Sequence, residues 1–130
     1  RVTQLEGHAD TVTGCAVQRD QGNDVLVTCS ADKTVRVWDV RARSPEVMML
    51  TGHADRITCG SWSSSQSLFF TGSNDLTVRG WELRKGKEIG ELTGHKDSVL
   101  AVAAWGDRVV SACVWGYLYT WSVAGLTERG

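Results

Sequence analysis

Short apolar runs alternate along the chain with clusters of Gly, Asp, Ser and Asn. The runs hold roughly four to six residues and centre on residues 25–27, 68–70 and 109–110. Runs of this length between turn-forming clusters are typical of buried strands, whereas helices need longer segments with apolar residues every three or four positions. No segment offers that helical spacing. The pattern therefore predicts an all-β fold.

Glycine and aspartate, rather than proline, supply the predicted turns. The chain has 14 Gly and one Pro, and Gly adopts the positive φ angles of tight hairpins at little cost. Gly106-Asp107 separates two apolar runs and is short enough for a two-residue hairpin. The strands are therefore expected to be antiparallel and joined by short connections.

Three similar units follow one another along the chain, each opened by a Gly-His pair and closed by a Trp. The pairs are Gly7-His8, Gly52-His53 and Gly94-His95, and the Trp residues are Trp38, Trp81 and Trp121. The pairs stand 45 and 42 residues apart, and the Trp residues 43 and 40. Such a period indicates a repeat architecture. We expect four short strands per unit: an outer one such as 47–50, then ones such as those near 12–17, 25–29 and 34–38. Neighbouring sheets must cover such a sheet.

Laid over one another, the units read GHADTV, GHADRI and GHKDSV, and later VTCSADKTVRVWD, FTGSNDLTVRGWE and VSACVWGYLYTWS. The chain thus resembles the WD40 repeat family, over repeats at about 1–40, 46–83 and 88–123. The resemblance implies a partial WD40-type β-propeller over 1–130, with three four-stranded antiparallel blades. Residues 2–5 are assigned to the outer strand of a preceding blade. Propellers have about four to eight blades, so blades of the same longer chain or a second copy must close the ring.

WD40 blades typically carry a tetrad of Asp, His, Ser or Thr, and Trp, and the resemblance implies such tetrads here. The matching positions are His8, Thr28, Asp32 and Trp38 in the first unit, His53, Thr71, Asp75 and Trp81 in the second, and His95, Ser111 and Trp121 in the third. Trp115 stands where the third unit should carry its Asp. We therefore expect an altered network in that unit.

An Asp, a His and a hydroxyl are also the ingredients of nucleophilic catalysis. Three near-copies at a period of 42 to 45 residues suit a part needed once per blade better than three active sites, so we interpret them as structural and predict no enzyme. A hydrolase is the distant alternative. No His or Cys pair has metal-ligand spacing, so neither a metal nor a cofactor is expected.

The resemblance also places the loop before each inner strand and the turn that holds the tetrad Asp on one face, a frequent docking surface. The candidate contact residues are Asp10, Thr11, Ala31, Asp55, Arg56, Asn74, Asp97, Ser98 and Val114. The three acids are alternatively caps of their turns. Trp115 and Tyr117 replace an Asp and a Thr on this face. They form either a contact hot spot or, if Trp115 folds over His95, a filling for the missing Asp.

A second binding motif is Trp38-Asp39-Val40-Arg41, with an echo in Trp81-Glu82-Leu83-Arg84. It is similar to the box by which some WD40 proteins dock the adaptor of cullin-RING ubiquitin ligases. A substrate receptor docking through Arg41 is therefore the alternative function. An Arg at this place is also common on solvated turns.

Composition narrows the class of partner. Fourteen Lys and Arg against 15 Asp and Glu give a net charge of −1, so no nucleic-acid or membrane partner is expected. The uncharged stretch 109–127 is long enough to span a membrane, but it aligns with charged segments and is interpreted as two buried strands. The chain opens on Arg1 and shows no leader, so we expect no signal peptide and a piece of something longer.

Four separated cysteines, with no framework for disulfides, are expected to be buried reduced thiols in an intracellular protein. They are Cys15, Cys29, Cys59 and Cys113. Nothing distinguishes cytoplasm from nucleus. The predicted function is a non-catalytic protein–protein interaction scaffold within a larger assembly.

Overall fold

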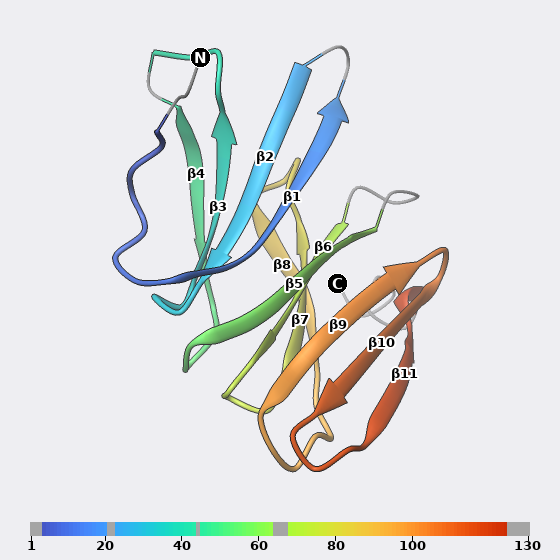
Figure 1. The fold of residues 1–130 in the computed structure, drawn as a ribbon. Coiled ribbons are helices and arrows are strands. Elements are labelled where there is room, and N and C mark those ends of the chain that lie inside the picture. The colour runs from blue at the N-terminus through green and yellow to red at the C-terminus, as the bar shows by residue number, and fades with distance from the viewer. Residues whose placement is uncertain (1–3, 21–22, 44, 64–67, 125–130) are drawn as a thin grey trace.

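The computed structural model describes residues 4–20, 23–43, 45–63 and 68–124, which form three antiparallel sheets. Figure 1 shows the sheets following one another from the blue N-terminal part to the red C-terminal part. Blade 1 contains β1 (Val12–Asp20), β2 (Asn23–Ser30), β3 (Thr34–Asp39) and β4 (Glu46–Thr51). Blade 2 contains β5 (Ile57–Ser63), β6 (Leu68–Ser73), β7 (Val78–Glu82) and β8 (Lys87–Leu92). Blade 3 contains β9 (Val99–Trp105), β10 (Arg108–Cys113) and β11 (Leu118–Ser122).

Within each blade the strands pair with their neighbours in chain order. Corresponding strands keep the same register, so that Thr28 pairs with Arg36 and Thr71 with Arg79. The hairpin between β9 and β10 turns through Gly106 and Asp107, with Gly106 at a φ of 51°. The predicted two-residue hairpin is therefore confirmed, as is the all-β fold.

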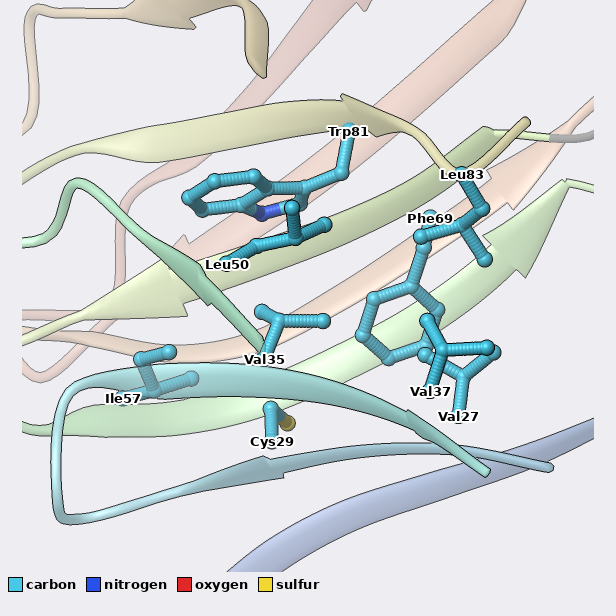
Figure 2. Close-up of a cluster of buried hydrophobic side chains, with 9 residues drawn as sticks. All are labelled: Val27, Cys29, Val35, Val37, Leu50, Ile57, Phe69, Trp81 and Leu83. Carbon is cyan, nitrogen blue, oxygen red and sulfur yellow. The ribbon is translucent and has the colours of Figure 1, made fainter. Parts of the chain in front are cut away.

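Blades 1 and 2 pack face to face through a hydrophobic core. Figure 2 shows its nine buried side chains, which are Val27, Cys29, Val35, Val37 and Leu50 from blade 1 and Ile57, Phe69, Trp81 and Leu83 from blade 2. The core thus lies between the sheets, where neighbouring blades cover each other.

Blades 2 and 3 repeat this arrangement in a second core. Leu68, Phe70 and Val78 of blade 2 pack there against Val109 and Val123 of blade 3, beside Val99 at the start of β9. Gly72 lies at the closest approach, because a Cβ there would come within 2.5 Å of Val99 and 2.7 Å of Cys59. A larger residue at this position would push the two blades apart.

A threonine hydroxyl on the inner strand also joins each blade to the next. Thr13 Oγ1 donates to the carbonyl of Ile57 at 2.9 Å, and Thr58 Oγ1 donates to the carbonyl of Val99. Leu100 holds the corresponding place in blade 3 and offers no hydroxyl. The junction beyond blade 3 therefore differs from the two junctions within the chain.

The two outermost faces of the stack are exposed. Val35 and Val78 are 0% exposed at the centre of the two cores, whereas Leu118, at the same repeat position in blade 3, is 71% exposed. Val12 and Val17 are exposed on the opposite face, which belongs to blade 1. Both faces carry exposed apolar side chains, as a blade-to-blade interface does, but no blade covers them among the described residues.

One prediction about the strands needs correction, and another lies partly outside the described residues. Blade 3 has three strands in the described part of the chain, so its fourth strand stays a prediction. In blades 1 and 2 the outer strand begins six to eight residues after the closing Trp, and the same spacing after Trp121 falls within 125–130, outside the described residues. Gln4 and Leu5 are not in a strand, because an outer strand pairs with the third strand of its own blade and the described chain supplies none for them. Residues 1–3 lie outside the described residues.

Burial was overestimated for the last strands and for two cysteines. The stretch 109–124 contributes β10 and β11 as expected, but most of β11 is exposed because no described residue packs on its far side; residues 125–127 are outside the described range. All four cysteines are free; Cys29 and Cys113 are buried, Cys59 is partly exposed and Cys15 is exposed on the open face of blade 1. No helix in the described residues is long and apolar enough to cross a membrane.

Candidate functional site

The tetrad of blade 1 forms one chain of hydrogen bonds from its core to its rim. Trp38 Nε1 donates to Thr28 Oγ1 at 2.8 Å, which leaves the Thr28 hydroxyl hydrogen for Nε2 of His8, 2.6 Å away. Nδ1 of His8 therefore carries the ring proton and donates it to Asp32 Oδ2 at 2.9 Å. The sequence places these four residues far apart, and the blade brings them into contact.

The Asp32 carboxylate is held by backbone groups as well. Its Oδ2 accepts from the Ala9 N–H at 3.0 Å, and its Oδ1 accepts from the Thr34 N–H at 2.9 Å and from the Thr34 hydroxyl at 2.5 Å. A carboxylate that receives several hydrogen bonds is stabilised in its charged form. Asp32 thus ties the loop before β1 to the turn before β3.

Blade 2 repeats this network with nearly the same distances. Trp81 Nε1 lies 2.8 Å from Thr71 Oγ1, and His53 bridges Thr71 and Asp75 at 2.7 and 2.8 Å. Asp75 accepts from the N–H groups of Ala54 and Thr77 at 3.0 and 2.9 Å. Two independent copies therefore define how this fold holds a carboxylate.

These contacts change the acidity of both partners. Burial alone would raise the pKa of Asp75, but hydrogen bonds from Thr77, His53 and Ala54 outweigh it and lower the pKa to about 2. The same balance holds the pKa of Asp32 well below its usual range. Burial lowers the pKa of His53, against the opposing effect of Asp75. At neutral pH the His53–Asp75 pair is therefore a neutral imidazole beside a carboxylate.

Blade 3 keeps half of the network. Trp121 Nε1 donates to Ser111 Oγ at 2.8 Å, and Ser111 lies 2.6 Å from His95 Nε2. Trp115, at the Asp position, offers no side-chain oxygen, and Nδ1 of His95 has no hydrogen-bond partner among the described residues although His95 is only 4% exposed. The predicted altered network is thus a buried imidazole with one unpaired nitrogen.

Tyr119 packs beside His95, a contact that sequence reasoning missed. The two rings meet edge-on with centroids 4.4 Å apart, and Tyr119 stacks on Trp121 at 5.7 Å. Blades 1 and 2 carry Arg36 and Arg79 at this position, each paired with a glutamate of the outer strand at 2.6 Å. The aligned units showed that Tyr119 replaces an Arg, but they did not show that the Tyr119 side chain points toward His95.

Trp115 and Tyr117 point to solvent. They are 65% and 57% exposed, so Trp115 does not fold over His95. The turn that carries them is nevertheless regular: Cys113 N–H donates to the Tyr117 carbonyl at 3.1 Å, as Ser73 N–H does to Thr77 at 3.2 Å in blade 2. The turn backbone is thus conserved between blades while its side chains have changed.

The other candidate contact residues lie where each loop meets its turn. Backbone hydrogen bonds of 2.8–3.1 Å join Ala31 to Thr11, Asn74 to Arg56 and Val114 to Ser98. Asp10, Asp55 and Asp97 each accept from the next N–H at 2.7 Å. The acids therefore cap their turns, as the alternative interpretation predicted. The structure brings together one such loop and turn in each blade.

The hydroxyls and the docking motif complete the picture. Thr71 and Ser111 are 0% exposed, and each hydroxyl is engaged with a histidine and an indole. In the Trp38–Arg41 motif the indole is buried in its tetrad, whereas Val40 and Arg41 are exposed. No group of three metal-binding side chains occurs among the residues that the structure describes.

Comparison with known families identifies the repeat. The family model of the WD domain, G-beta repeat, matches residues 1–39 and 44–82, which is more than half of the chain. The chain belongs to the WD40 repeat family. Its tetrads, blades and inter-blade cores are therefore those of a WD-type β-propeller.

Several relatives of different kinds are similar to this WD40 chain. Mouse telomerase protein component 1 is 29% identical over an alignment of 126 residues, which covers 95% of this chain and 5% of that protein. Zebrafish apoptotic protease-activating factor 1 is 36% identical over 75% of this chain and 8% of its own. The F-box/WD repeat-containing protein sel-10 of Caenorhabditis elegans is 37% identical over 70% of this chain and 14% of its own. The chain thus spans a small fraction of these relatives.

A solved structure, that of U3-55K, superposes with a TM-score of 0.83 at 21% identity. The match covers 93% of this chain and 38% of that one. At this identity the likeness shows the fold alone.

Proposed function

We propose that this WD40 chain is a non-catalytic scaffold that binds other proteins within a larger assembly inside the cell. WD40 proteins generally serve as protein-interaction scaffolds. The observation that carries the proposal is the exposed turn of Trp115 and Tyr117, because large aromatic side chains held by an ordered backbone are the usual anchors of interfaces. The names of the relatives describe proteins with diverse roles, so we propose only that the partner is a protein.

The buried tetrads support the absence of catalysis. A nucleophilic hydroxyl must reach its substrate, whereas the hydroxyls of Thr71 and Ser111 are buried and already bonded to an indole and an imidazole. The nearly balanced charge supports proteins rather than nucleic acids as partners. Free cysteines support a reducing compartment.

The exposed faces of blades 1 and 3 support a ring completed by further blades. The small share of each relative that the chain matches is consistent with blades supplied by a longer chain, and a second copy is the other source. Such a closed ring would leave the turn of Trp115 on its surface.

A second candidate function is substrate recruitment to a cullin-RING ubiquitin ligase. It is favoured by the exposure of Val40 and Arg41 after the buried Trp38 and by the likeness to sel-10, whose name describes an F-box/WD repeat-containing protein. Only the last two residues of the motif are free to contact an adaptor.

One capture experiment separates these candidates. The tagged chain and its Trp115→Ala, Arg41→Ala and Lys85→Ala variants are incubated with cell extract, and bound proteins are quantified. We expect the parent chain to capture proteins that the Trp115→Ala variant no longer captures. The Lys85→Ala variant, changed at another exposed turn, is the control and should still capture them. Loss of a ligase adaptor with Arg41→Ala alone would favour the second function. Equal recovery with all four chains would contradict both.

A further inference from the structure

Blades 1 and 2 show which groups of this fold receive a carboxylate. In each blade the tetrad Asp accepts hydrogen bonds from three nitrogen donors. They are Nδ1 of the histidine, the backbone N–H of the residue directly after the histidine, and the backbone N–H of the residue two positions after the Asp. The three distances are 2.9, 3.0 and 2.9 Å for Asp32 and 2.8, 3.0 and 2.9 Å for Asp75. The corresponding groups of blade 3 are Nδ1 of His95 and the N–H groups of Lys96 and Tyr117. We call these three groups the blade-3 cradle.

The cradle has the same frame as its counterparts. His95 is bonded to Ser111 through Nε2, and its centroid lies 6.2 Å from Trp121 at 55°, against 6.0 Å and 55° for His53 and Trp81. Val114 N–H donates to Ser98 as Asn74 N–H does to Arg56. Since ring and turn are placed alike, Nδ1 of His95 is aimed at the position that a carboxylate fills in the other blades.

Two features distinguish the cradle from its counterparts. No side chain of blade 3 supplies the oxygen, so Nδ1 of His95 is left without a partner although the residue is 96% buried, the complement of its 4% exposure. In addition, Lys96 replaces Ala9 and Ala54 directly after the histidine. Relative to the other units, blade 3 thus lacks the acidic residue of the tetrad and has a basic residue directly after its histidine in the sequence. The neighbouring Asp97 does not fill the cradle, since its carboxylate caps Ser98.

We propose that the blade-3 cradle binds the carboxylate of an Asp or Glu side chain on an acidic peptide segment of a partner. Lys96 supplies the countercharge, and Trp115 and Tyr117 contact apolar side chains next to the acid. The proposal rests on the proposed scaffold function and names the chemistry that the partner presents. Charge-assisted hydrogen bonds of this kind are stronger than neutral ones.

The test uses ¹⁵N-labelled protein and two short peptides, acetyl-Leu-Asp-Leu-amide and its Asn counterpart. We expect the Asp peptide to bind roughly tenfold more tightly or better and to shift the amide signals of Lys96 and Tyr117 and the Nδ1 signal of His95. The equivalent signals of Ala54 and His53 should not move, because their cradle already holds Asp75. Lys96→Ala should weaken binding of the Asp peptide and leave that of the Asn peptide unchanged.

Two variants at one position provide the matched control. Trp115→Asp places a carboxylate of the chain itself in the cradle, so it should abolish the preference for the Asp peptide and raise the melting temperature. Trp115→Ala supplies no carboxylate to the cradle and should retain the preference. If Trp115→Asp does not fold, the preference for the Asp peptide is compared between Trp115→Ala and Lys96→Ala. The proposal then requires that Trp115→Ala keeps this preference and that Lys96→Ala weakens it.

Equal affinity for the Asp and Asn peptides, or no response at Lys96 and Tyr117, would overturn the proposal. The scaffold function would survive either result, because it is tested by the loss of captured proteins with Trp115→Ala. Acetate is the third probe. Binding of acetate with no gain from the peptide would overturn the peptide assignment and leave a simple anion site.

Discussion

Asp75 shows how much of a blade depends on one carboxylate. It holds His53 on one side and the backbone of Ala54 and Thr77 on the other, so it joins two segments that are more than 20 residues apart in the chain. Removal of one partner from such a buried network leaves the others unsatisfied, at a cost of about 1–3 kcal/mol.

The lowered pKa values of this network predict that the free energy of unfolding decreases in two stages as the pH falls. Burial lowers the pKa of His53, so the unfolded chain takes up a proton first as the pH falls below about 6.5, and stability begins to decrease there. Asp75 has a pKa of about 2 when folded and about 3.9 when unfolded. Its contribution is therefore complete above pH ~4 and is lost as the pH falls toward 2. Urea unfolding followed at a series of pH values measures both stages.

Asp75→Asn is the control for the second stage. The variant should be less stable at neutral pH by about 1–3 kcal/mol and should show a shallower loss of stability below pH ~4. A variant whose acid profile coincides in shape with that of the parent would show that Asp75 has no such role.

At this scale the sequence predicted which residues matter but not always where their side chains point. The aligned units resemble WD40 repeats closely enough to group His53, Thr71, Asp75 and Trp81, because the four positions match the tetrad of that family. They could not show that Tyr119 turns toward His95, since the direction of a side chain depends on what packs around it. The choice between an exposed and an inward Trp115 stayed open for the same reason.

Among the strands, β5 provides the hydroxyl that joins blade 2 to blade 3. Thr58 Oγ1 donates to the Val99 carbonyl, and β1 repeats the contact through Thr13 and Ile57. Because the acceptor carbonyl starts the inner strand of the next blade, the bond fixes the spacing between two sheets that share no backbone ladder.

We predict that Thr58→Val destabilises the protein by about 1 kcal/mol, because it removes one intramolecular hydrogen bond while keeping the shape of the side chain. The measurement is the urea midpoint by circular dichroism. Thr51→Val, at an exposed position at the end of β4, is the matched control and should change little. Equal midpoints for Thr58→Val and the parent protein would show that apolar packing alone joins the blades.

Strand positions were predictable because each strand is a short apolar run between turn residues. The first unit was expected to have strands near 12–17, 25–29 and 34–38, and β1, β2 and β3 contain these ranges. Their ends were less predictable, since pairing extends a strand beyond its apolar residues. Burial of β11 could not be predicted from its own sequence, because it depends on what lies beyond blade 3.

For the whole molecule, the decisive feature is that the stack of blades has two unlike apolar faces. Blade 3 offers a hollow of about 230 Å³ lined by Ala101, Val102, Ala103, Val110, Ala112 and Leu118. Blade 1 offers Val12 and Val17 on the other face. Each internal junction joins a face like the open face of blade 3 to a face like that of blade 1. The open face of blade 3 in one copy can therefore pack against the face of blade 1 in another copy.

We therefore predict that the 130-residue chain associates with itself through the face of blade 3 as its concentration rises. Leu118 corresponds to the fully buried Val35 and Val78, and burial of a leucine contributes about 1.5–3 kcal/mol. Leu118→Lys should therefore shift association to at least roughly tenfold higher concentration. Light scattering after size exclusion, over a dilution series, measures the mass.

Val47→Lys is the matched control for this experiment. Val47 is about as exposed as other open apolar residues, but it lies on the outer strand β4 rather than on the face of a blade-to-blade junction. It should associate as the parent chain does. If Leu118→Lys and Val47→Lys reduced association equally, the effect would be one of general surface charge. A parent chain that stays monomeric at every concentration would contradict the prediction.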